Sequence, residues 1–170
     1  MSRAALLLAC VVLFGCAKLD MNASGGASAA NPDAQLMREL TQANFAEITA
    51  GKLAVSKAPS GAVREYGRRL VEAHTSLQTE AAQLASLGSL PVPTTLDAHR
   101  QVPLKKLEAM SGESFERAYL EQMLKGHAET AALLERTAAE ARDPRLRAHA
   151  QEALPQVRQH LKRARDIAGI

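Results

Sequence analysis

The sequence has few of the residues that thiol chemistry, aromatic cores and β-sheets require. Tryptophan is absent, aromatic residues make up 3% of the chain, and the only cysteines are Cys10 and Cys16. Strands favour β-branched and aromatic side chains, whereas this chain places alanine and leucine between charged residues, as packed helices do. The composition therefore predicts an all-α fold.

Several catalytic sequence patterns are also missing. The chain has no Ser-His-Asp order, no glycine-rich phosphate loop and no Cys-x-x-Cys-His haem motif. These absences argue against a hydrolase, a nucleotide enzyme and a c-type cytochrome. We therefore lean towards a protein without enzymatic activity.

The amino terminus, MSRAALLLACVVLFGC, is a short apolar run behind one basic residue. It is too short to span a membrane and is typical of a signal-peptide core. Its last four residues resemble a lipobox, the processing signal of bacterial lipoproteins, which implies a signal peptide over 1–15 and lipidation of Cys16. Cleavage before Cys10 would leave too little apolar core for export. A plain secretory signal with an incidental cysteine is the alternative.

Acylation at Cys16 would leave the mature domain without a thiol, and so without a disulfide or a cysteine-ligated metal. The lipid would anchor the protein to a membrane. Residues 17–18 lack the aspartate that retains some lipoproteins at the inner membrane, so resemblance favours an outer membrane lipoprotein whose domain faces the periplasm. Residues 16–32, rich in Ala, Ser, Gly and Asn, are expected to be a flexible tether.

The remaining residues, 33–170, suit a single domain. Lysine and arginine total 21 against 18 acidic residues, a mild excess that argues against nucleic-acid binding. Basic residues do gather on one face near the carboxyl end, which fits either a solvated face or contact with anionic lipid headgroups. We expect the domain to be monomeric.

Capping residues, glycines and prolines divide this domain into four long helices and one short one. Asp33 is expected to cap the first helix, Gly88 to end the second, and Asp143-Pro144 to open the last. The expected helices cover about 33–57, 60–88, 104–110, 113–142 and 143–168. Two hairpins joined by a long connection describe a ferritin-like four-helix bundle with one crossover.

Four segments carry a resemblance to a known family: FAEITAGKLAVSKA, RRLVEAHTSL, SGESFERAYLEQMLKGHAE and LPQVRQHL. Together they are similar to an uncharacterised bacterial family whose members are often labelled outer membrane proteins and grouped with ferritin-like folds. The resemblance extends over nearly all of 33–168. The family commonly has an aspartate before each of the first two histidines, where this chain has Ala73 and Gly126. The resemblance implies the fold and no established activity.

Each long helix presents one metal-competent side chain on its apolar stripe at about 100° per residue. Counted from the turns, the members of each hairpin also lie at similar heights near mid-bundle. These four candidate ligands are Glu47, His74, His127 and His160. Three nitrogens and one oxygen suit a single Zn²⁺, Cu²⁺ or Fe²⁺. The alternative is a buried polar network without metal, in which His74 would hydrogen-bond an ionised Glu47.

Other features of these helices refine the prediction. Di-iron bundles use Glu-x-x-His on two helices, but Val71 and Val157 stand three residues before His74 and His160, which argues against a di-iron centre. Met123 is either a core residue or a soft ligand for copper. His99 and His149 are expected at the surface. Pro155 is expected to bend the last helix or to re-aim the histidine that follows.

Overall fold

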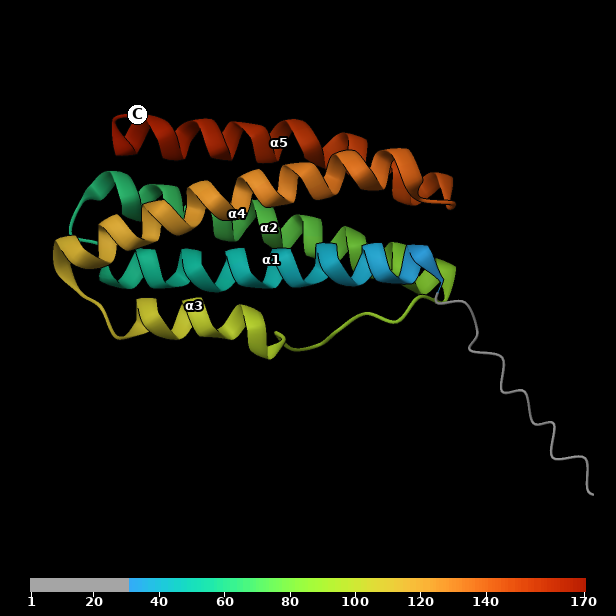
Figure 1. The fold of residues 1–170 in the computed structure, drawn as a ribbon, viewed down its shortest axis with the longest axis horizontal. Helices are drawn as coiled ribbons and strands as arrows, with labels where there is room; N and C mark the ends of the chain where they lie inside the picture. The colour runs from blue at the N-terminus through green and yellow to red at the C-terminus, as the bar shows by residue number, and fades with distance from the viewer. Residues whose placement is uncertain (1–30) are drawn as a thin grey trace, which may run out of the picture.

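Four long helices lie side by side in antiparallel pairs, and one short additional helix runs along a face of the bundle (Figure 1). The computed structural model describes residues 31–170, so the predicted signal peptide, Cys16 and most of the tether lie outside the described part. The helices are α1 (Pro32–Lys57), α2 (Gly61–Gly88), α3 (Ala98–Glu108), α4 (Gly112–Glu140) and α5 (Pro144–Ala168). The predicted all-α fold is confirmed.

The long helices form two hairpins that pack against each other. α1 packs mainly on α2, and α4 mainly on α5, while α1 also contacts α4 and α2 contacts α5. The chain after α2 returns along the bundle, and α3 then lies against α1 and α4 (Figure 1). This is the ferritin-like bundle with one crossover that the sequence predicted. Within residues 31–170, no helix combines the length and apolar character that a bilayer-spanning segment needs.

The short crossover helix α3 begins at Ala98, earlier than the predicted residue 104. Asp97 caps it by accepting a hydrogen bond from the backbone N–H of Arg100 at 2.8 Å. The amide of Gln42 on α1 holds the chain just before it, donating to Thr95 O at 2.7 Å and accepting from the N–H of Asp97 at 2.9 Å. A buried α1 side chain thus sets where the crossover becomes helical, and local sequence spacing could not show this.

The buried apolar residues form two separate clusters along the bundle axis. One cluster includes Leu36, Leu40, Leu77, Leu134 and Val157, and the other includes Ala50, Leu70, Phe115, Tyr119 and Ala164. The buried polar side chains Asn44, Glu47, His74 and His127 occupy positions on the helices between these two sets. We call this region the polar layer.

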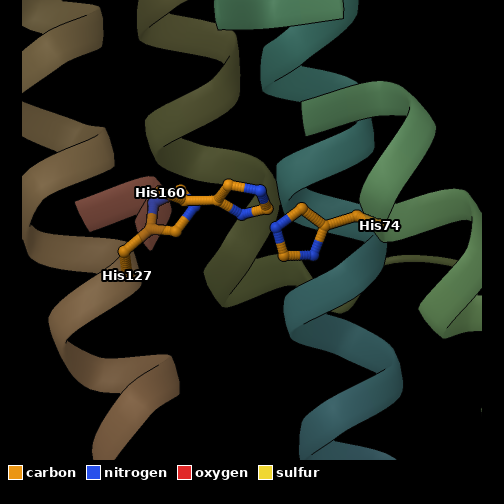
Figure 2. Close-up of side chains that lie close together, drawn as sticks. All are labelled: His74, His127 and His160. Carbon is orange, nitrogen blue, oxygen red and sulfur yellow. The ribbon is translucent and has the colours of Figure 1, made fainter. Parts of the chain in front are cut away.

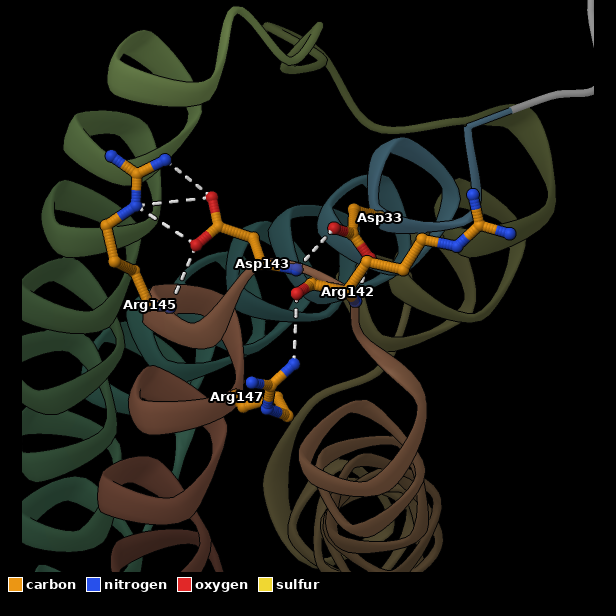
Figure 3. Close-up of polar contacts among 5 residues, drawn as sticks. All are labelled: Asp33, Arg142, Asp143, Arg145 and Arg147. Carbon is orange, nitrogen blue, oxygen red and sulfur yellow. Dashed lines mark hydrogen bonds and ion pairs between the residues drawn. The ribbon is translucent and has the colours of Figure 1, made fainter.

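Asp33 does not cap α1 as predicted, because Asn31 does so by accepting a hydrogen bond from the N–H of Asp33 at 3.1 Å. The Asp33 carboxylate instead accepts from the backbone N–H groups of Arg142 and Asp143, at 2.7 and 2.8 Å (Figure 3). Asp33 is 6% exposed. It therefore ties the start of the first hairpin to the turn of the second.

The same contacts occur at both hairpin turns, and each residue of the second turn stands 83 positions after its counterpart in the first. Arg64 donates to the carbonyls of Ala58 and Pro59. Arg147 donates to the carbonyl of Ala141 and to that of Arg142, the second of which Figure 3 shows. The equivalent of Asp33 is Glu116 on α4, which accepts from the N–H of Ser60 at 3.0 Å. Each hairpin thus caps the other's turn. Sequence inspection predicted no such repeat, because few residue identities are shared.

Replacing Asp33 with alanine should destabilise the fold, because two backbone N–H groups lose a charged acceptor in a buried position. We expect a loss of about 2–4 kcal/mol in the free energy of unfolding, measured by urea denaturation followed by circular dichroism. Asp166→Ala is the matched control, since Asp166 makes only an exposed pair with Lys162 and should cost less than about 0.5 kcal/mol. Equal losses in the two variants would contradict the cross-capping role.

Candidate metal centre

Three histidines from three helices converge in the polar layer. His74 comes from α2, His127 from α4 and His160 from α5, and their rings turn towards one another (Figure 2). Their ring centroids are 5.4 to 5.7 Å apart, and one ring nitrogen of each lies within 4.8 Å of the others. His74 and His127 are 0% exposed and His160 is partly exposed. The sequence correctly predicted that these three inward faces meet at one height.

Hydrogen bonds to the first ring nitrogens fix which nitrogens remain free. His127 Nδ1–H donates to the carbonyl of Met123 at 2.8 Å, and His74 Nδ1–H donates to the amide oxygen of Asn44 at 3.0 Å. Their Nε2 atoms have no partner, and neither does His160 Nδ1. Two of the three rings are therefore held in one tautomer, with a lone pair available on the opposite nitrogen. This is the orientation that metal-bound histidines usually show.

An unpaired buried polar atom costs about 1–3 kcal/mol, so three of them at one place call for an explanation. The free Nε2 atoms of His74 and His127 both carry lone pairs, so they cannot satisfy each other, and a single N–H of His160 could satisfy only one of them. Zinc binds histidine nitrogen at about 2.0–2.1 Å, so two ligands on one tetrahedral ion lie about 3.4 Å apart. Side-chain adjustments of about 1 Å would bring the three nitrogens to that spacing.

The histidines are poised in the neutral form that metal ligation requires. Burial lowers the pKa of His127 to about 4, against a smaller opposing effect of its bond to the Met123 carbonyl. Burial, followed by the neighbouring His127, lowers the pKa of His160 to about 4. The pKa of His74 is also well below its usual value because of burial and the two other imidazoles. A cation would therefore meet little competition from protons near pH 7.

Glu47 lies beside the three histidines and is not part of their group. Its Oε1 is 3.8 Å from His127 Nδ1, too far for a hydrogen bond, and its Oε2 is buried without a partner. Burial raises the pKa of Glu47 to about 8, with Arg100 opposing the shift. The hydrogen bond between His74 and an ionised Glu47, which the alternative without metal includes, is not formed. Asn44 occupies that position at His74, and the Glu47 carboxyl is neutral near pH 7 in the metal-free protein.

Three further polar residues of this region were not predicted from the sequence. Asn44 orients His74, and it could have been found because it stands three residues before Glu47 on the same helix face. Tyr66 donates from its hydroxyl to the carbonyl of His160 at 3.1 Å. Tyr119 stacks beside Phe115, and its hydroxyl is buried without a partner. No sequence pattern distinguishes these two tyrosines from ordinary core residues.

The exposure of four further residues tests what the sequence predicted for them: His99, His149, Met123 and Pro155. His99 is exposed as expected, but His149 is 7% exposed, so the prediction of a surface position is wrong. His149 packs under α2, with its Nδ1 3.5 Å from Glu80. Met123 is a core residue whose side chain packs in the second apolar cluster. Pro155 lies on the exposed side of α5, and the helix continues through it to Ala168.

Two kinds of comparison relate this chain to known proteins. The family model DUF4142, described as a domain of unknown function, matches residues 19–167. No curated protein matches the chain significantly. Among solved structures, a DUF305 fragment from Deinococcus radiodurans is 12% identical with a TM-score of 0.72, covering 81% of this chain and 95% of that one. A DUF305 protein from Streptomyces coelicolor, named as a candidate secreted protein, is 13% identical with a TM-score of 0.68, covering 79% and 90%. These likenesses show the fold alone.

The buried histidines should make the metal-free protein sensitive to mild acid. The folded-state pKa of His127 is about 4, below the ordinary histidine value of 6.5, so the unfolded chain takes up the proton first. The stability that this residue contributes is therefore complete above about pH 6.5 and is lost as the pH falls towards 4.

We therefore compare the free energy of unfolding at about pH 7.5 and about pH 4.5, measured by urea denaturation in EDTA. The loss of this free energy on going to the lower pH should be about 2 kcal/mol smaller for His127→Gln than for the wild type. His99→Gln, at an exposed histidine with the same change of side chain, should keep the wild-type difference. Identical pH dependence in all three proteins would contradict burial of a neutral imidazole at position 127.

Proposed function

The chain belongs to the DUF4142 family of bacterial helical domains of unknown function, and on that premise we propose that its bundle binds one transition-metal ion through His74, His127 and His160. The observation that carries this proposal is that one ring nitrogen of each histidine lies within 4.8 Å of the others, and that each ring has a buried nitrogen without a partner. Asn44 and the Met123 carbonyl support it, because they hold two of the rings in the ligating orientation.

The ligand types favour zinc, copper or iron over harder cations. Imidazole nitrogen suits these three metals, whereas magnesium and calcium prefer oxygen ligands. Three histidines leave a fourth coordination position, and Glu47 is the nearest carboxyl group to them. We propose that Glu47 balances part of the charge of the ion, either as the fourth ligand or through a bound water molecule. Tyr66 and Tyr119 would enclose the ion on the side of the second apolar cluster.

The proposed setting is the bacterial envelope. The lipobox-like Leu13-Phe14-Gly15-Cys16 supports export and anchoring through a lipid on Cys16, with the bundle as a monomer at the periplasmic side of the outer membrane. The description of the similar Streptomyces coelicolor protein as a candidate secreted protein supports a place outside the cytoplasm. In that setting the bundle would hold a metal ion for storage, sensing or redox protection, without catalysis.

The competing hypothesis is a structural lipoprotein whose polar layer binds no ion. Metal analysis of protein purified without a histidine tag, followed by calorimetric titration with Zn²⁺ and with Cu²⁺, separates the two. We expect one ion per chain and a higher melting temperature when it is bound, because a ligand that binds only the folded state stabilises it. His74→Leu and His127→Leu should each abolish this binding while keeping the helical spectrum.

His149→Gln is the matched control, because this histidine is also buried but contacts Glu80, between one and two turns after His74 on α2. It should bind one ion as the wild type does. A wild-type melting temperature that no transition metal changes, together with an empty protein after tag-free purification, would leave the structural hypothesis.

Asn44 gives a second test, because it contacts the metal site only through His74. Asn44→Leu should leave the three histidines in place and weaken binding by about 10- to 100-fold, since the ring loses the acceptor that orients it. Thr41→Val is the matched control on the same helix, at a buried hydroxyl that also lacks a partner. Calorimetric titration of both variants should show the loss only for Asn44→Leu, and equal affinities would contradict the orienting role.

A further inference from the structure

A cation that binds at the three histidines needs a passage, because the protein closes over the site. His74 and His127 are 0% exposed, and the free nitrogens of all three rings are buried. Two directions lead to solvent: the side where α1 and α4 meet, and the side of α5 where His160 is partly exposed. The structure has a hollow on the first of these sides.

This hollow is a groove of about 450 Å³ between α1, α3 and α4. Its inner wall is formed by Ala43, Glu47, Met123 and Gly126, the last being the residue before His127. Glu47 lines the groove, and its Oε1 lies 3.8 Å from His127 Nδ1, the ring nitrogen that donates to the Met123 carbonyl. Its buried Oε2 has no partner, so a polar group is available at the inner end of the groove.

Gly126 lies directly against the Glu47 carboxyl group in this wall. A Cβ atom at position 126 would lie 2.8 Å from Glu47 Oε1, closer than two such atoms can approach. The absent side chain therefore gives the carboxyl group the space that it occupies against α4. Ala43 on α1 stands 83 residues before Gly126 and is the corresponding small residue on the α1 side of the groove. Larger side chains at these positions would push Glu47 out of its present place.

We propose that the groove is the passage through which a metal ion reaches the three histidines, with the Glu47 carboxyl as the last group that the ion meets and Gly126 keeping the way open. The proposal rests on the metal site described above and adds the route to it. The outer groove is lined by the carboxylates of Glu39 and Glu129 and by the cationic side chains of Arg100, Lys125 and Arg136. The two carboxylates offer oxygen contacts to an entering cation when they are not paired. Their pairs with Arg136 and Lys125 are exposed and exchange readily with solvent.

An obstructed passage has a kinetic signature that a damaged site lacks. A higher barrier on the route slows association and dissociation by the same factor and leaves the affinity unchanged, whereas a lost ligand weakens the affinity. The tyrosines report binding without a label, because the chain has only two and no tryptophan, and the Tyr66 ring centroid is 6.3 Å from that of His127. Stopped-flow quenching of their fluorescence by Cu²⁺ therefore measures the association rate, and chelator chase measures dissociation.

The test compares the full wild-type chain with Ala46→Leu and Gly126→Ala, which add bulk to the groove without removing a histidine. Both should slow association and dissociation about tenfold or more, and Ala46→Leu should keep the wild-type affinity within about twofold. Ala73→Leu is the matched control, a half-buried alanine one residue before His74 and outside the groove lining, and it should bind at the wild-type rate. Circular dichroism melts confirm that each variant folds.

Wild-type rates in both groove variants would overturn the passage while leaving the metal site in place. Slower binding in Arg163→Phe, which places a rigid ring one turn after His160, would overturn it in favour of a route past α5. Slower binding in Ala73→Leu would overturn it by showing that the effect is not specific to the groove. A wild type that shows no quenching and no calorimetric signal with Cu²⁺ or Zn²⁺ would overturn both the site and its passage.

Discussion

The burial of three neutral imidazoles at one level is the constraint on which the rest of the bundle depends. Without them, the two apolar clusters would be one continuous core, as in an ordinary helical bundle. With them, the layer carries several buried polar atoms that lack partners, and each costs free energy unless a ligand satisfies it. The apolar clusters on both sides must supply the stability that this layer does not, which explains the long helices around so small a site.

Keeping that layer level requires the two hairpins to stay in register. Asp33 and Glu116 do this at opposite ends of the bundle, because each carboxylate accepts hydrogen bonds from the turn of the other hairpin. A helix sliding by one turn would move about 5.4 Å and would separate His74 from His127 and His160. These contacts lie far from the layer and still fix its geometry.

The sequence predicted those parts of the molecule that depend on local spacing. Helical periodicity placed His74, His127 and His160 on inward faces, and counting from the turns placed them at one height, because the rise of a helix is the same everywhere. The parts that failed depend on partners far along the chain. The carboxylate of Asp33 accepts a hydrogen bond from a backbone N–H 109 residues away. The prediction that Asp33 accepts hydrogen bonds from backbone N–H groups was right, but the prediction that these groups belong to its own helix was wrong.

The same reason accounts for Glu47 and His149. Glu47 was correctly placed near the histidines, but the space that its carboxyl group occupies depends on Gly126 across the interface between α1 and α4. His149 stands between Ala148 and Ala150, and it is buried where α5 meets Glu80 of α2. The amide of Asn44 could have been included by the same angular count that found Glu47, because the two share one face of α1.

The shared offset of 83 residues has a consequence for the number of ions that such a bundle can hold. It pairs position 44 with 127, 47 with 130, 74 with 157 and 77 with 160, and in each pair the two residues differ: Asn and His, Glu and Thr, His and Val, Leu and His. A strictly duplicated hairpin would place every ligand twice about the twofold axis, which suits a binuclear centre. Because the two halves differ at all four pairs, the repeated architecture presents one asymmetric site here instead of two equivalent half-sites.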